Sequence, residues 1–278
     1  MNASLPYLKI IRPQNALLAG AAVALGFWLG HSALSPFSLI LLVASAIAAT
    51  GFGNVVNDLQ DISTDRISHP DRPLPRGDIP AGNALIYAWC LAVLALLSSV
   101  FVSTAHLVAT VVPLLLLLLY TRFLKATPLA GNVVVSLLVA YALLFGGLKS
   151  PEFNRLIIPA LLAFLLNLSR EIIKDLEDKP GDTAAGIRTT AVLPLPVIRF
   201  VAGSIAAVYF ALLFMPRILY QFGNIYAIIC AFIVVPLQII WLALFFKKGP
   251  QLSIISLLIK VEMAAGLLAL AADKFFLK

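Results

Sequence analysis

The chain consists of long apolar stretches that are separated by short polar segments. Each apolar stretch is close to the ~20 residues that a helix needs to cross the hydrocarbon core of a bilayer. The polar segments contain proline and glycine, as in 70–82 and at Pro180-Gly181, and these residues end helices. The pattern predicts nine transmembrane helices, at approximately 14–33, 36–57, 84–103, 106–122, 131–149, 155–177, 191–214, 222–246 and 253–273.

The composition supports a membrane protein. Of the 278 residues, 61% are hydrophobic and 12% are charged, whereas about a quarter of a soluble domain is charged. The mean hydropathy is +1.00. No segment between the predicted helices is long enough for a soluble domain. We therefore expect an all-α polytopic membrane protein that forms a single domain over residues 1–278.

The basic residues distinguish the two sides of the predicted bundle. Fourteen of the 20 Lys and Arg residues fall on the side where the chain begins. The positive-inside rule places that side in the cytoplasm. Because nine helices put the chain ends on opposite sides, we expect the N-terminus inside and the C-terminus outside. The net charge of +7 then reflects topology and lipid contact, so we expect the bilayer, and no nucleic acid, as a partner.

Ten of the 13 carboxylates fall in or beside two short acidic runs on that same side. Within each run, three Asp residues are spaced i, i+3, i+7, which puts them on one face of a helix. We expect Pro180 and Gly181 to end the second helix and to leave Asp182 in a loop. The matching positions are Asn54, Asp58, Asp61 and Asp65 in the first run, and Glu171, Asp175, Asp178 and Asp182 in the second.

These oxygen ligands favour a hard cation such as Mg²⁺ over zinc. Mg²⁺ typically joins one or two carboxylates to substrate phosphates, so two facing runs would hold a departing diphosphate between metal ions. The alternative is a pair of solvated helix ends, with Lys174 paired to Asp178. The metal candidates are Asp58, Asp61, Asp65, Asp175, Asp178 and Asp182, and of these Asp58, Asp61, Asp175 and Asp178 are the catalytic candidates.

Basic side chains near the two runs are candidates to contact the diphosphate. Two follow the first run, one lies in the loop after the fourth predicted helix, and three belong to the second run or follow it. For each of them, lipid-headgroup contact or a role in topology is the alternative. These candidates are Arg66, Arg72, Lys125, Lys174, Lys179 and Arg188.

The two runs and the loops beside them resemble the UbiA superfamily of intramembrane prenyltransferases. The segment 54–66 with the following His69-Pro-Asp-Arg72 is similar to the first signature of that superfamily. The loop 120–125 with Gly131-Asn132 is similar to the next block, and 170–190 is similar to the second acidic signature. His69 and Arg76 depart from the Asn and Ser that many members have there.

The resemblance implies a helical bundle around a central cavity, two Mg²⁺ ions and a polyprenyl diphosphate donor. Because the acidic runs lie on the side with most basic residues, we expect the active site to face the cytoplasm from the cell membrane. It implies diphosphate contacts for Asn54, Arg66, Arg72, Tyr120 and Lys125. Loss of diphosphate would leave an allylic cation, which requires a dry pocket. Candidates to line that pocket are Phe52, Phe145 and Phe164.

The acceptor is the least determined part of this hypothesis. The second signature and the segment 7–15 are most similar to members that add a second geranylgeranyl chain to geranylgeranylglyceryl phosphate. An aromatic acceptor, as in quinone, haem or chlorophyll synthesis, is the alternative. An ion-coupled transporter is a remote alternative, since it would place carboxylates near mid-membrane. Lys260 and Glu262 lie in the last predicted helix, and we expect Lys260 to extend to the interface.

Overall fold

The computed structural model describes residues 5–125, 127–184 and 186–276, and these residues form helices and no strands. The elements are α1 Leu5–Ile10, α2 Pro13–Leu29, α3 Pro36–Gln60, α4 Ile62–Ser68, α5 Ala81–Val100, α6 Thr104–Leu119, η1 Tyr120–Leu124, α7 Ala130–Gly146, η2 Phe153–Leu156, α8 Ile157–Ala184, η3 Thr190–Val192, α9 Leu195–Leu212, α10 Met215–Tyr220, α11 Asn224–Ile229, η4 Cys230–Val234, α12 Val235–Phe246 and α13 Leu252–Phe276. Both η1 and η4 are π-helical turns.

Seven of the described helical segments are long and apolar enough to cross a membrane. The stretches predicted at 14–33 and 131–149 form α2 and α7, two apolar helices of 17 residues each. The all-helical membrane bundle is therefore confirmed, whereas the predicted count of nine spans is not. The seven segments are Pro36–Gln60, Ala81–Val100, Thr104–Leu124, Phe153–Ala184, Leu195–Tyr220, Asn224–Phe246 and Leu252–Ala272.

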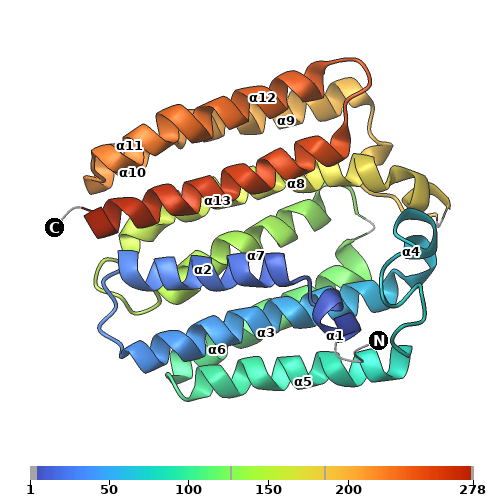
Figure 1. Cartoon of the computed structure of the whole chain (residues 1–278), viewed down its shortest axis with the longest axis horizontal. Helices are drawn as coiled ribbons and strands as arrows, with labels where there is room; N and C mark the ends of the chain where they lie inside the picture. The colour runs from blue at the N-terminus through green and yellow to red at the C-terminus, as the bar shows by residue number, and fades with distance from the viewer. Residues whose placement is uncertain (1–4, 126, 185, 277–278) are drawn as a thin grey trace.

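The helices are stacked side by side in one bundle (Figure 1). Helices α3 and α5 pack together near one edge, and α2 and α7 occupy the middle. Helix α8 packs against α7, α9 and α13, and α12 joins α13 and α9 at the opposite edge. The short helices α1 and α4 lie at one end of the bundle (Figure 1). This arrangement surrounds the interior with α2, α3, α7, α8 and α13.

Glycine allows α2 and α7 to approach closely. A Cβ atom on Gly26 would collide with the backbone carbonyl of Leu143, and one on Gly146 would collide with that of Val23. Small residues at helix contacts are typical of membrane bundles, because packing rather than the hydrophobic effect holds the helices together. The contact fixes α7 against α2 and so defines one wall of the interior.

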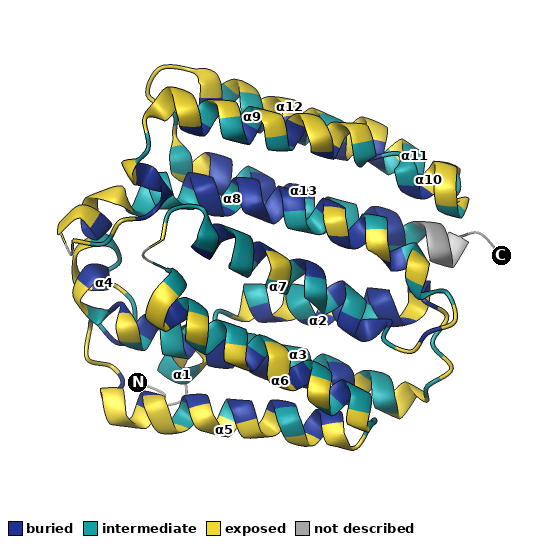
Figure 2. Ribbon diagram, turned by 180° about the vertical axis from the view of Figure 1, so that it is seen from behind, coloured by how far each residue is buried: buried dark blue, intermediate teal, exposed yellow. Residues whose placement is uncertain are grey.

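The outer surface of the bundle is apolar. Figure 2 shows exposed residues along the outer faces of α5, α9 and α12, and buried residues on the faces turned inward. Phe200 on α9 and Phe232 in η4 are each 75% exposed. Exposed aromatic and aliphatic side chains on this scale mark a surface that contacts lipid, in agreement with an integral membrane protein.

The second acidic run differs from its expected shape. Helix α8 continues through Pro180 to Ala184, so Asp182 lies on the helix and the expected loop position is wrong. Proline removes its own N–H from the helical ladder. The next residue, Gly181, packs tightly against Ser68 of α4, where any added Cβ would collide. Packing against α4 therefore compensates for the helical hydrogen bond that Pro180 cannot form.

The first acidic run is also not one continuous helix. Helix α3 ends at Gln60, and α4 begins at Ile62. Asp61 joins the two helices, and its backbone N–H still donates to the Asn57 carbonyl at 3.0 Å. The three carboxylates of this run therefore belong to two helices and to the joint between them.

Candidate active site

Two cavities adjoin inside the bundle. The larger one has a volume of about 320 Å³ and a mostly apolar lining, and the smaller one of about 40 Å³ is mostly polar. Four residues from α3, η1 and α8 line both cavities, so they mark the junction. These residues are Asn57, Tyr120, Glu171 and Lys174.

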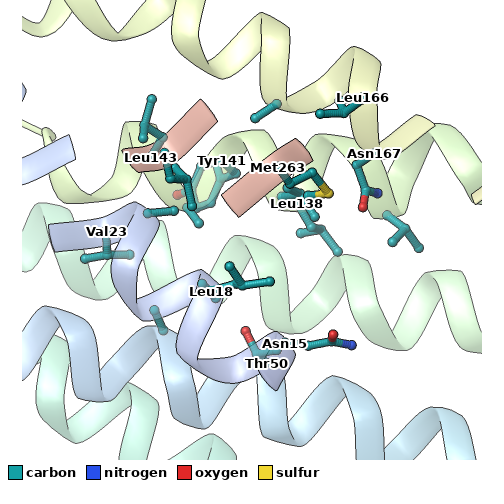
Figure 3. Close-up of a pocket in the computed structure, with 18 of the residues that line it drawn as sticks. Asn15, Leu18, Val23, Thr50, Leu138, Tyr141, Leu143, Leu166, Asn167 and Met263 are labelled. Carbon is teal, nitrogen blue, oxygen red and sulfur yellow. The ribbon is translucent and has the colours of Figure 1, made fainter. Parts of the chain in front are cut away.

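The apolar cavity lies between α2, α3, α7, α8 and α13 (Figure 3). In Figure 3, Leu18, Leu138, Leu166 and Met263 contribute apolar side chains, and Asn167 adds an amide. Such a lining suits a prenyl chain and excludes water.

Of the three predicted aromatic lining residues, Phe145 lines this cavity. Phe52 packs instead against Trp89, with the ring centroids 5.8 Å apart. Phe164 packs against the core of the bundle. Glu262 of α13 also lines this cavity; it is buried and accepts a hydrogen bond from Trp241 Nε1 at 2.8 Å.

Each carboxylate of the first run is paired with a basic side chain. Arg72 Nη1 donates to both carboxylate oxygens of Asp65, at 2.6 and 2.7 Å, and lies 3.7 Å from Oδ1 of Asp58. Asp58 is 2% exposed, and such a buried carboxylate requires a cation or several donors. The pairs are Asp58–Arg12, Asp61–Lys125 and Asp65–Arg72.

Two carboxylates of the second run have neutral partners instead. Asp175 Oδ2 accepts hydrogen bonds from Asn132 Nδ2 and from the Thr190 backbone N–H, both at 3.0 Å. Asp182 Oδ2 accepts one from Thr189 Oγ1 at 3.2 Å. Neutral donors hold these carboxylates in place without compensating their charge. Within the described residues, Asp175 and Asp182 therefore lack the ion-pair partner that each carboxylate of the first run has.

Asp178 joins the second run to the first. His69, which follows α4, lies with Nε2 3.0 Å from Asp178 Oδ1. On the other side, Lys174 Nζ is 3.7 Å from Asp178 Oδ2, which is the i, i+4 pair expected for a solvated helix end. His69, one of the two departures from the superfamily pattern, thus links the two runs directly.

The π-turn η1 positions Tyr120 and Lys125. The Lys125 backbone N–H donates to the Tyr120 carbonyl at 2.9 Å, so the turn brings Tyr120 to the junction of the cavities and Lys125 to Asp61. Single π-turns inside helices are frequently found at functional sites. This loop is therefore part of the site, as the superfamily signature implied.

The structure brings most of the predicted site residues together. Apart from Asp58, which is buried beside the polar cavity, the metal candidates line that cavity. Asn54 lines the apolar cavity and donates to the Ile11 carbonyl at 2.9 Å. The predicted residues that line the polar cavity are Asp61, Asp65, Arg72, Tyr120, Lys125, Lys174, Asp175, Asp178 and Asp182.

Three predicted substrate contacts lie elsewhere. Arg66, Lys179 and Arg188 are exposed, and among the described residues they belong to the lining of neither cavity. Their positions next to the acidic runs in sequence do not bring their side chains inward. Their role in binding stays a prediction.

Sequence reasoning missed several partners of the carboxylates. One is Arg12, which has a left-handed backbone with φ 51° directly before Pro13, an uncommon conformation for such a residue. The signal that could have identified Arg12 is its position directly before Pro13, the proline that begins α2. Asn132 follows a glycine in a block that resembles the superfamily. The missed residues are Arg12, Asn57, His69, Asn132, Thr189 and Thr190.

The donor set fits Mg²⁺ and not a metal held by protein ligands alone. Among the described residues, no three His, Cys, Asp or Glu side chains are grouped closely enough to hold an ion. Mg²⁺ does not need such a group, since one or two carboxylates, water and substrate phosphates suffice. Six carboxylates around one polar cavity supply these ligands.

Fold and site together define a class of protein: a helical membrane bundle with a carboxylate-lined cavity that opens into an apolar one. The chain belongs to the UbiA prenyltransferase family, which it matches over residues 17–261. It is therefore a prenyltransferase, as the acidic signatures predicted. Membership of this family also decides against the transporter alternative.

Similar proteins agree with this assignment. The digeranylgeranylglyceryl phosphate synthase of Methanothermobacter thermautotrophicus is 34% identical over 278 residues, which cover 96% of this chain and 95% of that protein. The enzyme of the same name from Methanoculleus marisnigri is 38% identical over 185 residues, or 66% of each chain.

Solved structures also share this fold. A digeranylgeranylglyceryl phosphate synthase structure is 30% identical with a TM-score of 0.79 and full coverage of both chains. A UbiA homolog from Archaeoglobus fulgidus, bound to GPP and Mg²⁺, is 18% identical with a TM-score of 0.67, over 96% of this chain and 99% of that one.

Proposed function

We propose that this prenyltransferase transfers a geranylgeranyl group from its diphosphate to geranylgeranylglyceryl phosphate, with Mg²⁺ as cofactor. The observation that carries the proposal is the pair of adjoining cavities, one lined by six carboxylates and one apolar. The names of its relatives support this acceptor, and the GPP and Mg²⁺ bound to the Archaeoglobus homolog support this donor class and metal.

The two acidic runs would hold the diphosphate end of the donor. Two Mg²⁺ ions, one at each run, would stabilise the negative charge that develops on the departing diphosphate. Lys125 and Arg72 line the same cavity and would bind the diphosphate oxygens that the metal ions leave free. The residues that would hold the ions are Asp58, Asp61 and Asp65 in the first run, and Asp175, Asp178 and Asp182 in the second.

The apolar cavity would bind the geranylgeranyl chain and keep water from the reacting carbon. The carbon–oxygen bond to diphosphate breaks, and a new one forms to the hydroxyl oxygen of the glycerol. The hydroxyl proton leaves to the released diphosphate or to a carboxylate. Because Tyr120 and Asn57 lie at the junction of the cavities, we place the reacting carbon beside them.

We further propose that α2 and α7 cross the membrane as well, which gives nine spans in one domain over residues 1–278. Seventeen residues make a helix of about 25 Å, close to the ~30 Å hydrocarbon core. The excess of basic residues at the end of the bundle that holds the polar cavity supports a cytoplasmic active site, with the N-terminus inside and the C-terminus outside.

The test is a transfer assay with purified protein, geranylgeranyl diphosphate, Mg²⁺ and a panel of acceptors. We expect geranylgeranylglyceryl phosphate to be prenylated and the reaction to stop when EDTA removes the metal. Transfer to hydroxybenzoate but not to geranylgeranylglyceryl phosphate would contradict the proposal and favour the aromatic-acceptor alternative.

A further inference from the structure

Lys260 lies inside a membrane-spanning helix and faces the apolar cavity. It is on α13, within the candidate span Leu252–Ala272, and its half-buried side chain lines the cavity. Its extension to the membrane interface stays a prediction. Among the described residues, Lys260 has no ion-pair partner. A lysine placed this way is costly and points to a functional role.

Other cations line the same cavity as Lys260. They are Arg12, Arg170 and Lys174, and the carboxylate of Glu171 belongs to the same lining. Helices α2 and α8, which carry or adjoin these cations, both pack against α13. Like charges on one cavity wall repel each other. Arg12, Arg170 and Lys174 each contact a carboxylate, so Lys260 is the cation that a bound anion would compensate.

The cations on α8 are incompletely paired. Arg170 Nη1 contacts Glu171 Oε1 at 2.5 Å, but its Nε is buried without a hydrogen-bond partner. Lys174 is one helical turn away on the same face, and its ammonium lies 3.7 Å from Asp178. An arginine with a free N–H, next to two lysines, has the geometry and charge to bind a phosphate.

This cluster is adjacent to the polar cavity but separate from it. Arg170 and Lys260 line only the apolar cavity, whereas Lys174 and Glu171 line both. An anion held here would therefore have its head beside the junction. Apart from Lys174, which also contacts Asp178, the cations paired with the acidic runs remain available to a second anion.

We propose that Arg170, Lys174 and Lys260 form the binding site for the phosphate monoester of the acceptor lipid. The inference rests on the proposed function, because it requires an acceptor that carries a phosphate. With the donor diphosphate between the acidic runs and the acceptor phosphate on this cluster, the glycerol hydroxyl would meet the donor carbon at the junction. The cluster thus selects an anionic amphiphile as acceptor.

The test compares Lys260→Met with the wild-type enzyme in nanodiscs, by initial rates against donor and acceptor separately. We expect the KM for geranylgeranylglyceryl phosphate to rise about tenfold, as for a lost hydrogen bond to a charged group, and the donor KM to change less than about twofold. Geranylgeranylglycerol, which lacks the phosphate, should react equally poorly with both proteins. Lys260→Arg should restore the acceptor KM, which a general folding defect would not allow.

The matched control is Lys248→Met, which removes an exposed basic residue outside both cavities and should leave both KM values unchanged. An unchanged acceptor KM in Lys260→Met would overturn this site and leave the proposed function standing. Suppose that the rate of Lys260→Met no longer depends on phosphatidylglycerol in the nanodiscs, while its acceptor KM is unchanged. This result would assign the cluster to bilayer headgroups and would also overturn the proposed acceptor site. Wild-type enzyme that cannot use the phosphate acceptor would refute the proposed function itself.

Discussion

The two acidic runs have the same spacing, but several of their carboxylates have different kinds of partner. In the first run, three carboxylates are paired with Arg12, Lys125 and Arg72. In the second run, Asp175 and Asp182 accept hydrogen bonds from neutral amide, hydroxyl and backbone groups. An identical sequence pattern can therefore produce different sites, because the partners come from distant parts of the chain.

The difference assigns different tasks to the two runs. A metal ion that approaches the first run competes with resident cations, and these cations become free to bind the diphosphate once they are displaced. A metal ion held by Asp175 or Asp182 displaces only neutral donors, which costs less electrostatic energy. At Asp178 the ion also competes with Lys174. We therefore infer that the second run is the stronger metal site and the first run the main source of diphosphate-binding cations.

The largest effect is expected from removing one carboxylate in either run. Asp58→Asn and Asp175→Asn should each lower kcat/KM by about 100-fold or more, because a charged group that stabilises the leaving diphosphate is lost. Turnover of the purified variants measures this, and protein yield in the membrane fraction shows whether they still insert. Near-normal activity in either variant would show that one run is sufficient.

A second pair of variants separates the tasks of the two runs. Lys125→Met should weaken donor binding about tenfold, since it removes a cation that faces the diphosphate site. Asn132→Ala should shift the Mg²⁺ dependence about tenfold upward, because outer hydrogen bonds hold a metal-binding carboxylate in place. Rates measured against donor and against Mg²⁺ distinguish the two outcomes. If both variants change donor binding, or both change the Mg²⁺ dependence, the two runs do not differ in their tasks as inferred.

A smaller effect is expected where the runs contact each other. His69→Ala removes the contact to Asp178 and should lower kcat/KM by about three- to tenfold. His69→Asn keeps a hydrogen-bond donor and restores the residue that many superfamily members carry, so it should recover most of the activity. Equal losses in both variants would indicate that the imidazole itself is needed.

The smallest change tests the packing that holds the runs together. Gly181→Ala adds one methyl group where Ser68 of α4 is in close contact. Overpacking of this kind typically costs about 1–3 kcal/mol, so the thermal unfolding temperature and the activity should both fall. Gly82→Ala is the matched control, because nothing lies within 4 Å of an added Cβ there and Gly82 lines neither cavity. An unchanged unfolding temperature in Gly181→Ala would show that α4 is not held by this contact.

Much of the fold and part of the site could be predicted from the sequence. Apolar length and Pro-Gly segments predict helices well, because backbone hydrogen bonds must be satisfied within each segment in lipid. The same local reasoning failed at Pro180, where packing of Gly181 against α4 carries the helix onward. Local signals do not include such long-range contacts.

The partners of the carboxylates were the least predictable part. Arg12 and Asp58 are 46 positions apart, and His69 and Asp178 are 109 apart, so no spacing rule connects them. The basic residues near the runs in sequence, such as Lys179 and Arg188, turn out to be exposed. Lys260 lines the cavity, a position that its place in the last predicted helix did not indicate.

Donor binding measured with and without Mg²⁺ tests most directly whether the two acidic runs act together. We would titrate a slowly reacting donor analogue, geranylgeranyl thiolodiphosphate, into wild-type protein and into Asp58→Asn and Asp175→Asn, with and without Mg²⁺. The account predicts that Mg²⁺ strengthens binding to wild type at least about tenfold and that either substitution removes most of this gain. Binding that gains equally from Mg²⁺ in all three proteins would contradict the central claim that the two acidic runs jointly hold the diphosphate.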